Sequence, residues 1–319
     1  MNSLRYPGDP GHVESYFLRA NHPSRPLAVW VKLTLLAPLV GDAVAETWFI
    51  AFDGETNSTY AHRDTHPCDR HALADSLSAG TFRFNLLGGT ISGQAGAAAF
   101  NLAFTPLAGP VGAPLSMFPF AWMLTAPFPK SKLLSPVPAA RFEGTAHCFG
   151  QRWEVHEWLG MQGHNWGKEH APEYAWGQCV FPGEVPTMAE GFTGRIRLGT
   201  RLSPRLSALV VRRGEREYRF DSIVDLWRQE ATITDQRWTL RMRGRDGEAR
   251  LRMDAAGRPM ACLGYANPDG RMSYCFNSKL ADTLLEVSPR GEPAFHCQSP
   301  HGGALELLRS EPNPAFPVV

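Results

Sequence analysis

The sequence lacks a strong excess of charge of either sign. Its 32 lysine and arginine residues balance 31 aspartate and glutamate residues, so the net charge is +1 over 319 residues. Proteins that bind nucleic acids usually present a markedly basic surface, and we therefore expect no nucleic-acid partner. Lysine is also scarce in the second half, because 19 of the 20 cations in residues 185–319 are arginine.

The chain also lacks the patterns of secreted, redox-active and membrane-spanning proteins. No two cysteines form a CxxC pair, which argues against a zinc site or a dithiol redox motif. The first residues contain no apolar core of a signal peptide, and no apolar run approaches the ~20 residues that span a bilayer. We expect reduced thiols and a cytoplasmic location, which leaves open a peripheral contact with the inner face of a membrane. The six cysteines are Cys68, Cys148, Cys179, Cys262, Cys275 and Cys297.

Glycine and proline are abundant, and they separate short segments in which apolar and polar residues alternate. The 30 glycines and 26 prolines are typical of an all-β protein with many turns. We expect a loop or extended chain at Pro127–Pro138, and short helical turns at Arg70–Ser78 and Ser116–Met123. The strands that we predict in the first half are Val13–Arg19, Ala28–Leu36, Glu46–Asp53, Thr81–Leu87, Ala98–Thr105, Arg141–His147, Gln151–Gly160 and Ala175–Phe181.

The second half shows a cleaner strand pattern. On both sides of the turn dipeptide Asp246-Gly247, apolar residues alternate with arginines, which indicates a hairpin with one buried face. We interpret the arginines as a solvated outer face, although they could bind phosphate or lipid head groups. Pro182–Pro186 is the expected boundary between two domains, residues 1–184 and 185–319, each an antiparallel β-barrel or sandwich.

The segment Gly163–Gly167, with the sequence Gly-His-Asn-Trp-Gly, is the most informative one. His164 and Trp166 are two residues apart, so in a strand they lie on the same face, and Asn165 points away from it. An imidazole next to an indole places a proton-handling group beside an apolar, electron-rich wall. We interpret the segment as the polar end of an apolar ligand pocket. The alternative is a hydrogen-bonded histidine that locks a β-turn.

Three carboxylates interrupt apolar strand patterns at Glu14, Glu46 and Glu190. A carboxylate that points into a core is costly unless it is paired. Any of the three that met His164 would form a plausible acid–base pair, whereas such residues more often lie at strand ends in solvent.

No segment predicts a metal or nucleotide site. Histidines, acids and a cysteine cluster between His62 and His71, but their spacing fits no standard zinc pattern. The glycine-rich segment Gly88–Gly96 lacks the lysine of a phosphate-binding loop. We therefore expect no metal site, and the glycine-rich segment is interpreted as a flexible hairpin loop.

The motifs resemble those of a known group of proteins. Glu14–Ala20, Pro129–Pro138 and above all Gly163–Gly167 look like the AttH-like superfamily, which includes carotenoid 1,2-hydratase, tocopherol cyclase and certain Diels–Alderases. The resemblance implies two consecutive lipocalin-like β domains with a pocket in or between them. It also implies activity on long isoprenoid or polyene substrates without an organic cofactor.

The resemblance carries over to individual residues at the histidine and tryptophan of the carotenoid hydratases, which match His164 and Trp166. Those enzymes are also thought to use a tyrosine and an aspartate a short way downstream. This chain has neither within residues 184–197, where Glu190 is the residue that could substitute.

The leading hypothesis is a cofactor-independent enzyme that protonates an alkene of an apolar isoprenoid or polyketide-like substrate, with hydration or cyclisation. The alternative is a non-catalytic lipocalin-type carrier of a hydrophobic small molecule. Either way the partner is a hydrophobic small molecule, and the sequence leaves the oligomeric state open. We assign catalysis to His164, Trp166 and Glu190, and contacts with the substrate to Asn165, Trp158, Tyr174, Trp176, Glu14 and Glu46.

Overall fold

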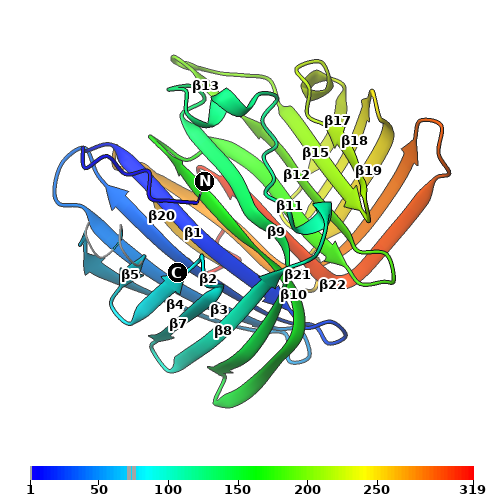
Figure 1. Cartoon of the computed structure of the whole chain (residues 1–319). Coiled ribbons are helices and arrows are strands. Elements are labelled where there is room, and N and C mark those ends of the chain that lie inside the picture. The colour runs from blue at the N-terminus through cyan, green and yellow to red at the C-terminus, as the bar shows by residue number, and fades with distance from the viewer. Residues whose placement is uncertain (1, 70–72, 74–76) are drawn as a thin grey trace.

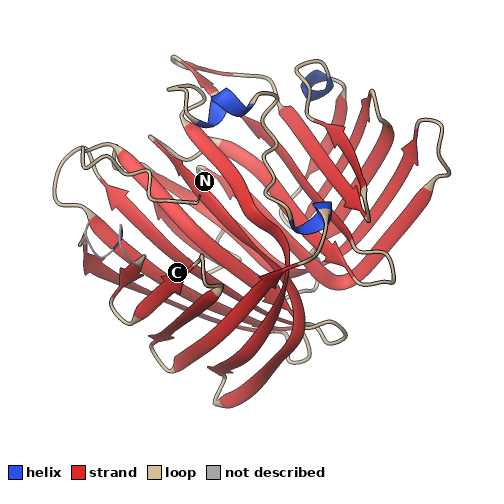
Figure 2. Cartoon of the chain, viewed as in Figure 1, coloured by secondary structure: helices blue, strands red, loops and turns tan. Residues whose placement is uncertain are grey.

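The protein is built almost entirely from antiparallel strands (Figure 1, Figure 2). The computed structural model describes residues 2–69, 73 and 77–319. Within this part of the chain the helical elements that the structure names are three short 3-10 turns, and no helix is long and apolar enough to cross a membrane. These turns are η1 (Pro110–Gly112), η2 (Ala121–Leu124) and η3 (Asp225–Trp227). The all-β fold class predicted from the sequence is confirmed.

The first ten strands form one sheet, which curves into a nearly closed barrel (Figure 1). The order of the strands in this sheet is β4-β3-β2-β1-β10-β9-β8-β7-β6-β5. The first strand, β1, therefore pairs with the last strand, β10. The strands are β1 (His12–Asn21), β2 (Leu27–Ala37), β3 (Val44–Asp53), β4 (Ser58–Pro67), β5 (Ser78–Ala79), β6 (Phe82–Asn85), β7 (Thr90–Ala95), β8 (Ala98–Pro106), β9 (Ser131–Cys148) and β10 (Gln151–Gly167).

The remaining strands form a second large sheet in the order β16-β15-β12-β11-β22-β21-β19-β18-β17, with β20 paired to β21. A separate small hairpin consists of β13 (Arg197–Leu198) and β14 (Arg201–Leu202). The strands of the large sheet are β11 (Glu173–Phe181), β12 (Thr187–Arg195), β15 (Leu206–Arg213), β16 (Arg216–Phe220), β17 (Gln229–Ile233), β18 (Arg237–Gly244), β19 (Gly247–Asp254), β20 (Ala261–Ala266), β21 (Met272–Pro289) and β22 (Phe295–Arg309).

The hairpin of β18 and β19 follows from the sequence pattern. Leu240 and Leu251 are paired and fully buried, whereas Arg241 and Arg250 point outward and form ion pairs with neighbouring glutamates. The tip of the turn lies one residue earlier than the Asp246-Gly247 dipeptide, because Gly244 pairs with Gly247. The arginine stripe is therefore the solvated face that we expected.

The boundary between the sheets differs from the expected one at residue 184. The chain leaves the first sheet at Gly167 and enters the second at Glu173, so β11 belongs to the second sheet. Pro182–Pro186 lies in the hairpin between β11 and β12. Proline and glycine favour a hairpin turn and an interdomain linker alike, so composition could not separate the two.

Two further local expectations need correction. Much of Pro127–Pro138 is strand, because β9 begins at Ser131. The prolines of β9 lie where the register with β10 shifts, and such irregular positions tolerate a residue without an N–H group. The turn expected at Ser116–Met123 is found as η2, displaced toward Leu124. The turn expected at Arg70–Ser78 falls largely on residues 70–72 and 74–76, which lie outside the described residues.

Apolar side chains form three clusters: one inside the first barrel, one within the second sheet, and one between the two. The middle cluster joins Trp30 and Trp48 of the first sheet to Leu263 and Tyr265 of the second. Every residue of β1 and β2 is buried, because one face of these strands lines the barrel and the other packs on the second sheet. The two sheets are thus held against one another by a continuous core.

Arg19 on β1 crosses this interface and is 2% exposed. Its guanidinium donates to Asn21 Oδ1 at 2.5 Å and to the carbonyl of Gly302 at 3.2 Å. It also donates to both the side chain and the carbonyl of Gln178 on β11. Burial lowers the pKa of Arg19 to about 10, so the group stays charged at neutral pH and has to be satisfied by these acceptors.

We predict that Arg19→Met lowers the free energy of unfolding by about 3 kcal/mol, since it leaves several buried acceptors without a donor. Urea denaturation at pH 7 measures the change. Arg152→Met, on the exposed end of β10, is the matched control and should stay within about 0.5 kcal/mol of the wild type. Equal stabilities of the two variants would contradict the bridging role of Arg19.

Candidate active site between the two sheets

A cavity of about 200 Å³ lies between the sheets and is mostly apolar. The strands contribute Phe17, Trp176 and Phe192 to its wall, and the segment 107–130 between β8 and β9 contributes Met117, Phe118 and Phe128. A smaller space of about 30 Å³, here called the polar recess, shares residues such as Phe17, Asn165, Tyr174 and Glu306 with it. The recess is therefore the polar end of the cavity, with room for one or two water molecules.

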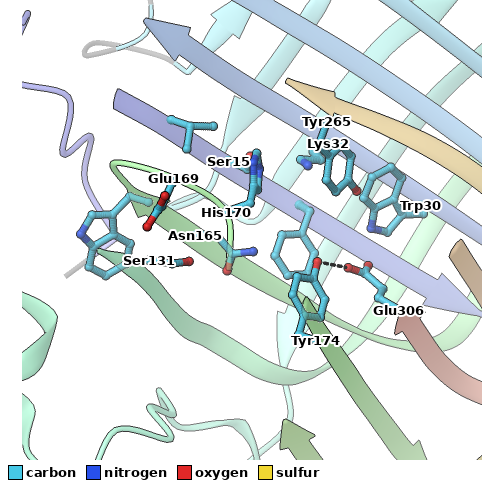
Figure 3. A pocket seen from close by; sticks show the side chains of 13 residues that line it. Ser15, Trp30, Lys32, Ser131, Asn165, Glu169, His170, Tyr174, Tyr265 and Glu306 are labelled. Carbon is cyan, nitrogen blue, oxygen red and sulfur yellow. Dashed lines mark hydrogen bonds between the residues drawn. The ribbon is translucent and has the colours of Figure 1, made fainter. Parts of the chain in front are cut away.

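Glu306 on β22 is the central acid of the polar recess (Figure 3). Its Oε1 accepts hydrogen bonds from Lys279 Nζ at 2.6 Å and from Asn277 Nδ2 at 3.2 Å. Its Oε2 lies 3.5 Å from the Tyr174 hydroxyl, the contact drawn in Figure 3. The ion pair with Lys279 fixes one oxygen and leaves the other directed toward the cavity residue Tyr174.

Lys32 enters the recess from the middle of β2 and is 5% exposed. Its ammonium lies 3.7 Å from the centre of the Tyr265 ring, a cation–π contact. Burial lowers the pKa of Lys32 to about 8, although the carboxylates of Glu306 and Glu46 oppose the shift. A lysine with this pKa is mostly protonated at neutral pH and gives up its proton readily, as a general acid requires.

His170 lines the recess as a neutral ring. Burial lowers its pKa to about 3, an effect that nearby Lys32 strengthens. The backbone N–H of His170 donates to Asn267 Oδ1 at 2.8 Å, and His170 Nδ1 lies 3.2 Å from the same oxygen. The amide nitrogen of Asn267 donates elsewhere, so its oxygen accepts and Nδ1 carries the proton. The other ring nitrogen is then a hydrogen-bond acceptor.

Tyr174 joins the recess to the apolar part of the cavity. Burial raises the pKa of its phenol well above 10, and Cys275 and Glu306 add to the shift. The hydroxyl therefore stays protonated and serves as a hydrogen-bond donor. Beside it, Trp176 and Phe17 meet edge to face with ring centres 5.9 Å apart, which gives the cavity an aromatic wall.

The structure brings several of the expected residues to this site. Asn165, Tyr174 and Trp176 line the cavity, and Trp166 lines the polar recess. The expected orientation around Asn165 is reversed, however. Asn165 faces the second sheet and the cavity, whereas His164 packs on Tyr16, whose side chain belongs to the core of the first barrel.

The structure therefore places His164 away from the cavity, on the barrel side of β10. It is fully buried, lines neither the cavity nor the recess, and its Nε2 lies 2.8 Å from Glu14 Oε1. Burial lowers the pKa of His164 despite this carboxylate. The ring is thus neutral, and its one N–H group donates to Glu14. This arrangement resembles the alternative given in the sequence analysis, in which His164 is a hydrogen-bonded structural residue.

Glu14 is likewise a structural group, contrary to its assignment to the substrate. It accepts hydrogen bonds from His12 Nε2 at 3.0 Å, from the Tyr16 hydroxyl at 2.7 Å and from the backbone N–H of Arg5. Burial alone would raise its pKa, but the hydrogen bonds from His12, His164 and Tyr16 outweigh burial and lower the pKa to about 2. This carboxylate ties the N-terminal segment to the barrel.

Three further assignments lie outside the cavity lining. Glu190 is behind the wall: it accepts from Trp176 Nε1 at 3.1 Å and from Ser135 Oγ at 2.8 Å, and burial raises its pKa to about 7. Glu46 shares a face of the first sheet with Lys32 and acts on it only through its charge. Trp158 belongs to the core of the first barrel and does not line the cavity.

Sequence reasoning missed Lys32, His170, Tyr265 and Glu306. Glu306 interrupts the apolar run of β22 in the same way as Glu190 interrupts β12, so the same signal was present. Lys32 lies in the middle of the apolar sequence of β2. A lysine in the middle of a strand buried on both faces is costly, and that cost was the usable signal.

Within residues 2–69, 73 and 77–319, no three histidine, cysteine, aspartate or glutamate side chains are grouped as a metal site. His71, part of the cluster considered above, lies outside the described residues.

Comparison with solved structures agrees with this architecture. Kievitone hydratase from Nectria haematococca superposes with a TM-score of 0.58 at 10% identity, over 94% of this chain and 89% of that one. CghA, in a crystal structure with Sch210972, superposes with a TM-score of 0.64 at 10% identity, over 94% of this chain and 89% of that one. A Nitrosomonas europaea protein described as an AttH gives 0.52 at 14% identity, over 96% and 97%. The chain shares the fold of these three proteins.

Sequence comparison adds two relatives with the same match. They are uncharacterized proteins of Mycobacterium tuberculosis, from strains CDC 1551 and H37Rv, each 24% identical over 293 residues. The match covers 90% of this chain and 84% of each relative. No family model matches the sequence. At these identities the likeness to the solved structures shows the fold alone, and the chemistry has to be argued from the site.

We predict that Glu14→Gln makes the protein less sensitive to acid. The pKa of Glu14 is about 2 in the folded state and 4.5 in the unfolded chain, so its stabilising effect is present above pH 4.5 and is lost as the pH falls toward 2. The wild type should lose about 3 kcal/mol more over this range than Glu14→Gln. Urea denaturation as a function of pH measures both, and Glu154→Gln, on an exposed side chain, should follow the wild type.

Proposed function

We propose that this protein is a cofactor-independent enzyme that transfers a proton to an apolar, unsaturated small molecule held between its two sheets. Hydration or cyclisation of an isoprenoid or polyketide-like substrate is the outcome. The observation that carries the proposal is an aromatic cavity that ends in Lys32, Tyr174 and Glu306. Apolar cavities with a few convergent polar groups and shifted pKa values are the usual form of an active site.

Lys32 is the proton donor in this proposal. Its ammonium gives a proton to a carbon of the substrate double bond, and the positive charge that develops lies among Trp30, Tyr265 and Trp176. A water in the polar recess, or a nucleophilic group of the substrate itself, then forms a bond to the cationic carbon and loses a proton. Glu306 is placed to receive that proton, either directly or through Tyr174.

The surroundings favour such a reaction for two physical reasons. Aromatic faces stabilise a neighbouring cation, and a mostly apolar lining strengthens the electrostatic interactions inside the cavity. A positioned general acid contributes about 10²–10⁴-fold, so orientation of the substrate supplies the rest. Support from outside the chain is that one protein of the same fold is named as a hydratase.

The proposal predicts conversion of an apolar compound with uptake of solvent hydrogen. Purified protein is incubated in D₂O with a lipid extract of its source cells, and mass spectrometry follows products that carry deuterium on carbon. We expect Lys32→Met to be at least about 100-fold slower, and the wild-type rate to fall as the pH rises through 8, because Lys32 then loses its proton.

Lys168→Met is the control, since Lys168 is exposed at the end of β10, and it should react like the wild type. The fold of Lys32→Met is checked by its urea midpoint, which should not fall, because an apolar side chain of similar size replaces a buried charge. Recovery of bound but chemically unchanged ligand from the wild type would contradict the proposal and favour a carrier.

A further inference from the structure

A second lysine of the cavity has no role in the proposed reaction. Lys132 on β9 lines the cavity and is 5% exposed, and its ammonium lies 5.9 Å from the centre of the Phe118 ring, which also lines the cavity. Among the described residues no hydrogen-bond partner reaches Lys132 Nζ. A buried ammonium without a partner costs several kcal/mol.

The carboxylates of the site are already engaged elsewhere. Glu306 is paired with Lys279 at 2.6 Å, and Glu169 with Arg271 at 2.9 Å. Glu190 accepts hydrogen bonds from Ser135 and Trp176 through Oε1, and its Oε2 has no hydrogen-bond partner among the described residues. No ion pair of the described residues includes Lys132, so no carboxylate of this part of the chain lies within 4.0 Å of its ammonium.

We propose that the cavity selects an apolar molecule with one anionic oxygen group, a carboxylate or an enolate, which binds the ammonium of Lys132. The apolar remainder of the ligand fills the aromatic part of the cavity. This inference rests on the proposed function in using the same cavity, and it names the substrate class. Lys132 then holds the ligand in place, and Lys32 at the polar recess is the lysine that reacts.

Two ligands that differ only in the head group test this inference. Calorimetric titration at pH 7 compares decanoate with decan-1-ol. The wild type should bind decanoate at least tenfold more tightly than the alcohol. Lys132→Met should lower the affinity for decanoate at least tenfold, because the charged contact is lost. Its affinity for decan-1-ol should stay within about twofold of the wild-type value.

Lys130→Met is the control, two residues earlier on an exposed side chain, and it should keep the preference for decanoate. Equal affinity of the wild type for the two ligands, or no binding of either, would overturn the inference. So would a preference that survives Lys132→Met. Lys32→Met should retain the preference while losing turnover, so the inference and the proposed function can fail separately.

A different observation concerns the outside of the same cavity. Three segments that line it, 117–129, 196–206 and 222–228, also carry eight of the 14 exposed large apolar side chains of the described residues. Figure 2 shows η2 and η3, which belong to two of these segments, at the same end of the molecule. The most exposed members are Trp122 at 62%, Trp227 at 55%, and Ile223 and Val224 at 53% each.

Positive charge accompanies this apolar rim. Arg201 and Arg228 are exposed within two of the segments. Neither guanidinium has a carboxylate within 4.0 Å in the described part of the chain, unlike most arginines of the second sheet. Exposed tryptophans flanked by arginines suit the interface of an anionic bilayer.

We infer that the rim docks on an anionic lipid surface, which places the cavity where an apolar ligand leaves the bilayer. Cosedimentation with vesicles of phosphatidylcholine alone, or mixed equally with phosphatidylglycerol, tests this. The wild type should bind the mixed vesicles with at least tenfold higher affinity than vesicles of phosphatidylcholine alone. The double variant Trp122→Ala/Trp227→Ala should bind the mixed vesicles at least tenfold more weakly than the wild type.

The control is Val40→Ala/Leu87→Ala, which removes two exposed apolar side chains outside the rim segments and should bind like the wild type. Failure of the wild type to bind the mixed vesicles would overturn the inference. A dimer in solution that the tryptophan variant abolishes, without any lipid binding, would assign the rim to a second copy of the chain instead.

Discussion

The structure depends on the buried contact that Arg19 makes across the two sheets. A guanidinium in an apolar interface is costly unless hydrogen-bond acceptors surround it, and here both terminal nitrogens of Arg19 find acceptors, which come from β1, β11 and β22. The requirement fixes the position of one sheet on the other, because a small slip would leave the charge without partners. The cavity lies along the same interface, so its shape depends on that alignment.

Two polar centres lie on opposite faces of β1 and β10 and have different tasks. On the barrel side, His12, His164 and Tyr16 all make hydrogen bonds with the carboxylate of Glu14, which leaves that carboxylate fully engaged. Lys32 and the other groups of the polar recess face the second sheet, with spare hydrogen-bonding capacity. A saturated network stabilises a fold, whereas a site for chemistry needs groups that are still free to react.

Much of the fold, and less of the site, could be predicted from the sequence. The alternation of apolar residues and arginines around Asp246 predicts the β18–β19 hairpin, because only one face of that pair of strands is buried. Alternation also told us that His164 and Asn165 point in opposite directions. It could not tell us which of them meets the second sheet, because that depends on a contact between distant parts of the chain. Lys32 was hidden for the same reason, since β2 is buried on both faces and shows no alternation.

The titratable residues and many of the apolar residues that line the cavity come from different parts of the chain. Lys32, Lys132, Tyr174 and Glu306 stand on paired strands, whose positions are fixed by the hydrogen-bond ladder, while much of the apolar wall comes from the connection 107–130 between β8 and β9. Reactivity and ligand shape are therefore encoded in separate stretches of sequence. Under the proposed function, changes in this connection would alter the shape of the cavity and leave the groups on the strands in place.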